Sequence, residues 1–278
     1  MLRMLPVLID THCHINMMVK STFDTPLQKT DLPLAKTIVE QAHAQNVGII
    51  INVGTRKVEN ENCILLAQTF DSVFATVGIH PNDSDTWQED FELLKKWTLS
   101  IRENKIVGIG ECGIDMHYPD YNLTRQRDAF KAQIELALEH DLALVVHSRD
   151  AYDETLRVLE EYKNNISRAT MHCFSYDTAF AQMVTEWDFV LGIGGTITYP
   201  KNEELRNIVK NTDLKNIVLE TDAPFLPPQI IRGKQNHPKE IATIAQFIAD
   251  LRGETLDVVA NVTTDNALKL FGLEEKLN

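Results

Sequence analysis

The sequence predicts an α/β fold, a TIM-type (β/α)8 barrel in which residues 1–278 form a single domain. Three observations favour this class. Short runs rich in Val, Ile and Leu recur along the chain, longer amphipathic stretches separate them, and polar residues gather where many of the runs end. Eight strands alternating with helices over about 250 residues is the pattern of such a barrel. We therefore expect the functional residues at the carboxyl-terminal ends of the strands.

The strands are predicted from apolar runs enriched in β-branched residues. The expected strands are residues 7–11, 47–53, 73–79, 105–111, 142–147, 169–173, 189–194 and 217–222. Between them, apolar residues recur with helical spacing. The clearest apolar stripes are Phe130, Ile134, Ala137 and Leu138 before the fifth strand, and Ile241, Ile244, Ala245 and Ile248 after the last.

A doubly wound open sheet is the alternative arrangement of the same elements. In that fold, the ligand lies in one crevice, and a G-x-G-x-x-G loop often follows the first strand. No such loop follows the first expected strand here, and polar residues end many strands instead of lining one crevice. Both observations favour the barrel.

Composition and charge restrict the classes of function. With 44% hydrophobic and 24% charged residues and no low-complexity tract, the chain is typical of a compact folded protein. Asp10 and His12 follow the first apolar residues too closely for a signal peptide, and no run reaches the roughly 18 apolar residues of a membrane helix. We therefore expect a cytoplasmic protein that does not enter membranes, and four free thiols.

A net charge of −13 argues against general coating of nucleic acid, because a phosphate backbone is normally met by a basic surface. A polyanionic substrate would have to be held locally. Bound divalent cations would supply the positive charge that this requires.

Histidines and carboxylates stand at the ends of several expected strands. His12 and His14 end the first strand in LIDTHCH, and the alternation of side chains places both on one side of it. The others are His80 in VGIHP, Glu111 in GECGID, His147 in VVHSRD, His172 in TMHCF and Asp222 in LETD. One such residue is usually an ordinary polar side chain, but seven at once are hard to explain that way. In a barrel they converge on one face.

Six of these residues predict a metal centre: His12, His14, Glu111, His147, His172 and Asp222. They offer nitrogen and carboxylate oxygen, which suits Zn²⁺, Mn²⁺ or Mg²⁺. A single catalytic ion typically uses about three protein ligands, so six predict two divalent ions per chain. Glu111 ends the fourth expected strand and is the only one of these carboxylates on a strand midway around the barrel, so it is the candidate bridge between ions roughly 3.5 to 4 Å apart.

Other residues near the predicted site have less specific interpretations. Cys13, Cys112 and Cys173 each neighbour a proposed ligand, so alternation should turn them toward the helices as core thiols. Cys63 lies in a helical pattern and is expected in the core as well. Glu220 shares a strand face with Asp222 but lies deeper, where a buried carboxylate could orient the ligands.

The remaining histidines divide into two pairs. His43 and His140 lie in or at the end of helical stretches and are expected at the surface or at a helix terminus. His117 and His237 lie in loops of the predicted active face, where either could contact the substrate.

Basic residues in the same loops are candidate substrate contacts. They are Arg149, Arg232 and Lys234. Lone basic residues are usually solvated, but beside a metal centre Arg149 and Arg232 could clamp phosphate and so hold an anion on an acidic protein.

An ordered set of motifs resembles the TatD family of metal-dependent deoxyribonucleases. The motifs are DTHCH, VGIHP, GECGID, VVHSRDA, HCFS, GGTIT, LETDAPFLPP and RGKQN, which run from about residue 8 to residue 238 and are followed by a helical tail. The resemblance implies a TIM-type barrel, two divalent metals and cleavage of DNA, often as a 3′–5′ exonuclease. The set is far more specific than any one motif.

The resemblance also implies roles for individual residues. His12, His14 and Asp222 would face one metal, His147 and His172 the other, and Glu111 would bridge them. His80 would belong to the active site without being a usual ligand.

Two positions depart from the family pattern. Met116 stands where the family commonly has an aromatic residue, and Asn236, His237 and Pro238 follow Arg232 where R-x-N-E-P is common. Both lie in substrate-facing loops, so they bear on substrate preference and leave the metal assignment intact.

The first functional hypothesis is a two-metal phosphodiesterase that acts on DNA, preferably single-stranded or end-frayed, with Asp222 receiving a proton from water. No obligate protein partner is inferred. The alternative is a binuclear amidohydrolase or deacylase acting on an amide, lactone or aminoacyl ester, since barrels host many chemistries. Many binuclear amidohydrolases have a modified lysine at the strand-four position that Glu111 occupies, which favours the first hypothesis. A catalytically silent scaffold would need missing ligands, and none is missing.

Overall fold

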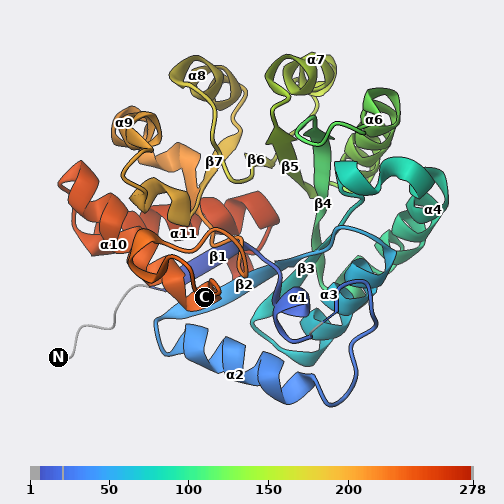
Figure 1. The fold of residues 1–278 in the computed structure, drawn as a ribbon, viewed down its shortest axis with the longest axis horizontal. Helices are drawn as coiled ribbons and strands as arrows, with labels where there is room; N and C mark the ends of the chain where they lie inside the picture. The colour runs from blue at the N-terminus through green and yellow to red at the C-terminus, as the bar shows by residue number, and fades with distance from the viewer. Residues whose placement is uncertain (1–6, 21, 277–278) are drawn as a thin grey trace.

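A barrel of eight parallel strands forms the centre of the computed structural model, which describes residues 7–20 and 22–276 (Figure 1). The strands follow one another around the sheet in sequence order. They are β1 (Leu8–Cys13), β2 (Val47–Val53), β3 (Val73–Val77), β4 (Ile106–Asp115), β5 (Ala143–Arg149), β6 (Ala169–Met171), β7 (Val190–Ile193) and β8 (Ile217–Leu219). Helices surround the barrel, so the predicted TIM-type (β/α)8 fold is confirmed.

Helices follow the strands along the chain. They are α1 (Ile15–Met18), α2 (Leu32–His43), α3 (Lys57–Thr69), α4 (Trp87–Thr98), α5 (Ile101–Asn104), α6 (Leu123–Glu139), α7 (Tyr152–Tyr162), α8 (Thr178–Glu186), α9 (Glu203–Asn211), α10 (Ile241–Arg252) and α11 (Leu256–Phe271). The two predicted apolar stripes lie in α6 and α10, where Phe130, Ile134, Ile244 and Ile248 are fully buried. In the part of the chain that the structure describes, no helix is both long enough and apolar enough to cross a bilayer.

The barrel closes between β1 and the segment that follows β8. The Thr11 hydroxyl donates to the Leu219 carbonyl at 2.9 Å, and the Asp222 amide donates to the His12 carbonyl at 2.8 Å. The short strand β8 therefore continues as an irregular segment beside β1. This closure places Asp222 next to His12, although the two residues lie near opposite ends of the sequence.

Most strand ends differ from the prediction by one or two residues, and the ends of β4, β6 and β8 bear on the functional site. β4 continues to Asp115, beyond the predicted end at residue 111, because its last four residues still pair with β5 after a register shift. β6 ends at Met171 and β8 at Leu219, both earlier than predicted. Soon after these ends, Cys173 and Asp222 adopt positive φ angles of 47° and 54°, which are incompatible with an extended strand.

The barrel interior is filled by aliphatic side chains. Ile51, Val145 and Val218 are fully buried in one apolar cluster, to which the end of α11 contributes Leu270 and Phe271. A larger cluster lies between the strands and the surrounding helices. The polar groups at the carboxyl-terminal end of the barrel therefore stand on a closely packed base, which limits their movement.

A buried carboxylate in α3 holds the segment that follows β1. Glu59 is fully buried and lies 2.6 Å from the Lys20 ammonium group. It also accepts hydrogen bonds from the side-chain amides of Asn16 and Asn62 and from the Asp24 backbone amide. Burial opposes ionisation of Glu59, but these donors outweigh it and lower the pKa of the carboxyl group.

We expect Glu59→Ala to lower the free energy of unfolding by about 3 kcal/mol, because it leaves a buried ammonium group without its partner. The measurement is denaturant unfolding beside Glu61→Ala, which removes an exposed carboxylate from the same helix. Because the pKa of Glu59 is lowered on folding, its contribution is complete above the ordinary value of 4.5 and declines as the pH falls below it. Equal stability of the two variants at neutral pH would contradict this assignment.

Candidate metal centre

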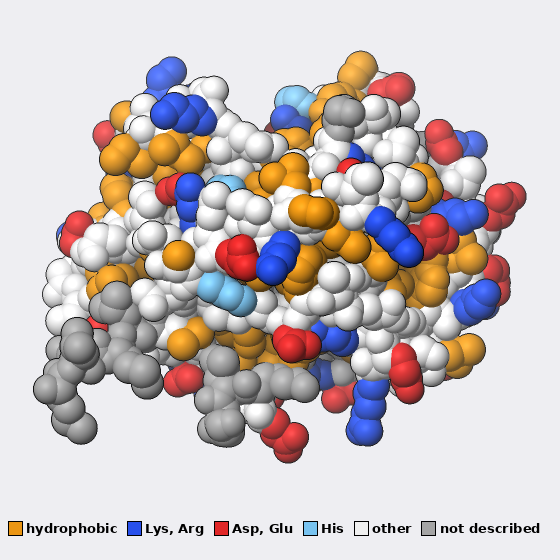
Figure 2. Space-filling model, turned by 90° about the horizontal axis from the view of Figure 1, so that it is seen from below, with side chains coloured by type: hydrophobic (Ala, Val, Ile, Leu, Met, Phe, Trp, Pro, Cys, Tyr) orange, Lys and Arg blue, Asp and Glu red, His pale blue; other side chains and the backbone are white. Residues whose placement is uncertain are grey.

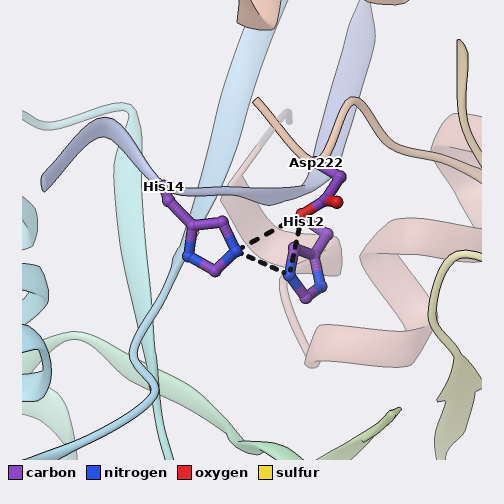
Figure 3. Close-up of side chains that lie close together, drawn as sticks. All are labelled: His12, His14 and Asp222. Carbon is purple, nitrogen blue, oxygen red and sulfur yellow. Dashed lines mark hydrogen bonds and ion pairs between the residues drawn. The ribbon is translucent and has the colours of Figure 1, made fainter. Parts of the chain in front are cut away.

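Two histidines from the end of β1 meet Asp222 from the segment after β8 (Figure 3). The Nε2 atoms of His12 and His14 are 3.2 Å apart. Oδ1 of Asp222 lies 3.4 Å from Nε2 of His14 and 3.8 Å from Nε2 of His12. All three side chains are largely buried, and their donor atoms lie close enough together to hold one ion.

Glu111, from β4, lies at the centre of the histidine cluster. Its Oε2 is close to His12 (3.4 Å) and His14 (3.9 Å), and its Oε1 to His147 (2.6 Å), His172 (3.6 Å) and His80 (3.7 Å). Each oxygen therefore faces a different group of imidazoles. This arrangement suits a carboxylate that bridges two ions.

His147 has a second carboxylate partner that the sequence analysis missed. Its Nε2 lies 3.2 Å from Oδ2 of Asp115, and burial of Asp115 is outweighed by this contact, which lowers the pKa of the carboxyl group to about 2. Donor atoms of His80, Asp115 and His147 gather in one group, and those of His12, Glu111 and His172 in another. The structure thus places His147 with Asp115, whereas the family resemblance pairs it with His172.

A signal for Asp115 is present in GECGID. The residue lies four positions after Glu111, so on an extended strand both side chains point to the same face. Because the predicted strand ended at residue 111, Asp115 was not expected to lie on the same strand face as Glu111.

The donor atoms of His14 are arranged as a metal site requires. Its Nδ1 lies 2.9 Å from the Val53 carbonyl oxygen, which can only accept, so Nδ1 carries a proton. In the neutral imidazole, Nε2 then presents a lone pair to Asp222 and to His12. A carbonyl that fixes the tautomer in this way is typical of histidines that bind metal ions. The residues present therefore fit a divalent cation.

The charges in the cluster lead to the same conclusion. Burial favours the neutral form of His172, but the Glu220 and Glu111 carboxylates outweigh burial and raise the pKa of its imidazole to about 10. The neighbouring histidines hold the pKa of Glu111 well below its usual range, against the effect of burial. The buried carboxylates thus favour positive charge at this position.

His80 differs from the other histidines of the cluster. Burial, reinforced by the nearby His147, lowers the pKa of its imidazole to about 3, so the ring is neutral. Its Nδ1 accepts a hydrogen bond from the Asn82 amide, which leaves the proton on Nε2, 3.7 Å from Glu111. His80 is therefore placed as a hydrogen-bond donor.

Glu220 lies beneath His172, buried as predicted. Its Oε1 is 3.0 Å from Nδ1 of His172 and accepts a hydrogen bond from the Cys173 amide at 2.6 Å. A Cβ atom at Gly192 would lie 2.2 Å from Oε2 of Glu220, so only glycine leaves room for this carboxylate. The geometry suits a carboxylate that orients an imidazole from behind.

We expect Glu220→Ala to weaken binding of one divalent ion by about 10- to 100-fold, since loss of an orienting carboxylate has this effect in metal sites. Gly192→Ala should act in the same direction because its methyl group displaces Glu220. Calorimetric titration with Mn²⁺ measures the change, and Glu186→Ala, which alters an exposed carboxylate in α8, is the control. Unchanged affinity in Glu220→Ala would contradict the orienting role.

The cysteines agree with the prediction at three positions. Cys13, Cys63 and Cys112 are fully buried in apolar clusters. The prediction for Cys173 is wrong. The positive φ angle of this residue ends the alternation of β6, and its thiol lies beside His172. It lines the cavity above the histidine cluster that His14, Glu111, His147 and Asp222 also line, called the metal cavity below.

The other histidines lie outside the cluster. His43 is exposed and contacts Ser72, and His140 follows the last residue of α6, so both agree with the prediction. His117 is paired with Asp150 at 2.7 Å. His237 is partly buried, and burial together with Lys239 lowers the pKa of its imidazole to about 4. Among the described residues that line the metal cavity, neither His117 nor His237 is found.

The two predicted phosphate clamps lie in different places. Arg149 lines the metal cavity, and its guanidinium group lies 5.8 Å from the centre of the Tyr118 ring. Arg232 lies outside this cavity, over the Tyr199 ring in a separate recess that also includes Lys201. The difference follows from their positions in the fold, since Arg149 ends β5 and Arg232 lies in the loop after β8.

A (β/α)8 barrel with histidines and carboxylates converging at its carboxyl-terminal end defines a class, the metal-dependent hydrolases with barrel folds. A family model described as TatD related DNase matches residues 9–272. The chain belongs to the TatD family and, as predicted, is a metal-dependent hydrolase.

The chain is also similar to individual proteins over most of its length. The uncharacterized metal-dependent hydrolase YabD of Bacillus subtilis is 33% identical over 266 residues, which cover 95% of this chain and 99% of YabD. The 3′-5′ ssDNA/RNA exonuclease TatD of Citrobacter rodentium is 31% identical over 244 residues, 86% of this chain and 92% of that protein. The crystal structure of YJJV, a TatD homolog from Escherichia coli, superposes with a TM-score of 0.84 at 29% identity, covering 95% of this chain and 98% of YJJV.

Proposed function

We propose that this enzyme hydrolyses the phosphodiester bonds of DNA as a 3′–5′ exonuclease that uses two divalent ions. The proposed ligands are His12, His14, Glu111, His147, His172 and Asp222. The observation that carries the proposal is the position of Glu111, whose two oxygens face different groups of histidines. The similarity to an exonuclease from Citrobacter rodentium supports the choice of bond.

Bound Zn²⁺, Mg²⁺ or Mn²⁺ ions would polarise the phosphoryl group as Lewis acids and stabilise its developing charge. Asp222, at the mouth of the cluster, is proposed to accept the proton of the attacking water. Neutral His80 is proposed to donate an Nε2 hydrogen bond to an oxygen of the substrate. Arg149, beside the same cavity, is suited to a phosphate of the bound strand.

The proposed substrate is a single-stranded or frayed end. With a net charge of −13, the surface repels a long duplex, and basic and acidic side chains are interspersed on the face shown in Figure 2. Binding would then depend on the ions and on a few local contacts. We also propose a cytoplasmic location, since four free cysteines suit a reducing compartment.

Parallel assays with Mg²⁺, Mn²⁺ and Zn²⁺ test this function. Single-stranded DNA labelled at its 5′ end should yield a ladder of progressively shorter products, the same strand labelled at its 3′ end should release labelled mononucleotide at once, and a chelator should stop both reactions. His14→Ala, purified identically, controls for a contaminating nuclease. Hydrolysis of aminoacyl esters without degradation of DNA would instead identify a deacylase. RNA and blunt duplex in the same series define the preferred nucleic acid.

A further inference from the structure

Two exposed aromatic rings stand on opposite sides of the metal cavity. Tyr118 follows β4 and Phe225 follows β8, four strands away in a barrel of eight. The two residues are 49% and 44% exposed. Both line the same cavity of about 560 Å³, which Glu111 and Asp222 also line.

The segment that carries Tyr118 contacts the end of β5 and the residue that follows it. The Met116 amide donates to the Arg149 carbonyl at 2.9 Å, and the His117 imidazole is paired with Asp150 at 2.7 Å. The Arg149 guanidinium lies near the tyrosine ring. The backbone that carries the exposed ring is therefore restrained by its neighbours, which lowers the entropy lost when a ligand stacks on the ring.

Hydrogen bonds restrain the backbone of Phe225 on the other side of the cavity. Its amide donates to the Asp222 carbonyl at 2.8 Å, and its carbonyl accepts from the side-chain amide of Asn236 at 2.7 Å. Asn236 is fully buried and also donates to the Thr221 carbonyl, so one amide fixes the whole turn. The Phe225 ring meets the His14 ring edge-on, with centres 6.1 Å apart. Phe225 thus adjoins the metal cluster directly.

We propose that Tyr118 and Phe225 are stacking positions for the bases of a single strand whose 3′ end lies at the metal cluster. The inference rests on the proposed function and names the contacts that hold its substrate. Stacking on an aromatic ring accepts every base and needs no basic surface, which suits an acidic protein. In a duplex the bases are already stacked on one another, so only unpaired nucleotides can reach these rings.

Kinetics with abasic DNA test the stacking. Oligonucleotides carrying one abasic site at each of the last three positions of the 3′ end are compared with the unmodified strand. For the wild-type enzyme we expect an abasic site at either of two of these positions to raise KM about tenfold, within the range for stacking on one ring, with kcat nearly unchanged. Tyr118→Ala should raise KM for the unmodified strand by a similar factor and lose sensitivity to one abasic position. Phe225→Ala should lose sensitivity to the other.

Two variants act as controls. Tyr118→Phe keeps the ring and should keep the low KM, whereas Tyr121→Ala removes a partly exposed ring of the same loop that does not line the cavity. Equal KM for abasic and unmodified strands, or additive losses in the variants, would overturn the stacking positions while leaving the nuclease intact. Failure to cleave any DNA would overturn the proposed function and the stacking positions together.

Discussion

Glu111→Gln should lower kcat about 1000-fold or more and reduce the bound metal from two ions per chain to one. The glutamine keeps one oxygen but replaces the other with an amide nitrogen, which cannot bind a cation. Because metal ions supply several kcal/mol of transition-state stabilisation, and each 1.4 kcal/mol changes the rate tenfold, losing one ion accounts for a change of this size. Metal analysis of the dialysed protein and steady-state kinetics measure the two effects.

Cys112→Ser is the matched control for this variant. It alters the next residue of β4, whose fully buried side chain points away from the cluster and contacts the Val145 carbonyl. Its metal content should equal that of the wild type. Equal metal loss in both variants would mean that the two faces of β4 are misassigned, and wild-type protein that never holds more than one ion would refute the binuclear centre.

Strands could be predicted where apolar runs are regular, and the cluster could be predicted because a barrel brings strand ends together. β2 matches its expected range, residues 47–53, without error. The alternation of side chains correctly predicted that Cys13 and Cys112 point toward the core, where both are fully buried. It failed at Cys173 because alternation holds only within a strand, and β6 ends two residues earlier.

Loops and the long strand β4 limited the prediction of the site. Gly110 and Gly113 interrupt the apolar pattern of β4, so Asp115 was not recognised, although pairing with β5 keeps this segment extended. Arg149 is the last residue of β5 and lines the metal cavity, whereas the loop after β8 directs Arg232 into another recess. Local sequence does not encode the course of such a loop, because it depends on distant contacts like those of buried Asn236.

The role of Asp222 can be separated from simple metal binding by a variant that keeps an oxygen. Asp222→Asn retains an acceptor at Oδ1, 3.4 Å from Nε2 of His14, but an amide cannot take up a proton from water. We therefore expect kcat to fall by about 10²- to 10⁴-fold, the usual contribution of a positioned base, while most of the metal remains at saturating concentration.

Asp222→Ala should lose both metal and activity, because it removes the oxygen as well. Metal content, kcat and binding of a single-stranded oligonucleotide are measured in parallel for the two variants and the wild type. If Asp222→Asn loses metal in proportion to its activity, Asp222 acts as a ligand alone. The proton must then be accepted elsewhere in the cluster, and Asp115 becomes the next carboxylate to test, since it lies 3.2 Å from the His147 imidazole.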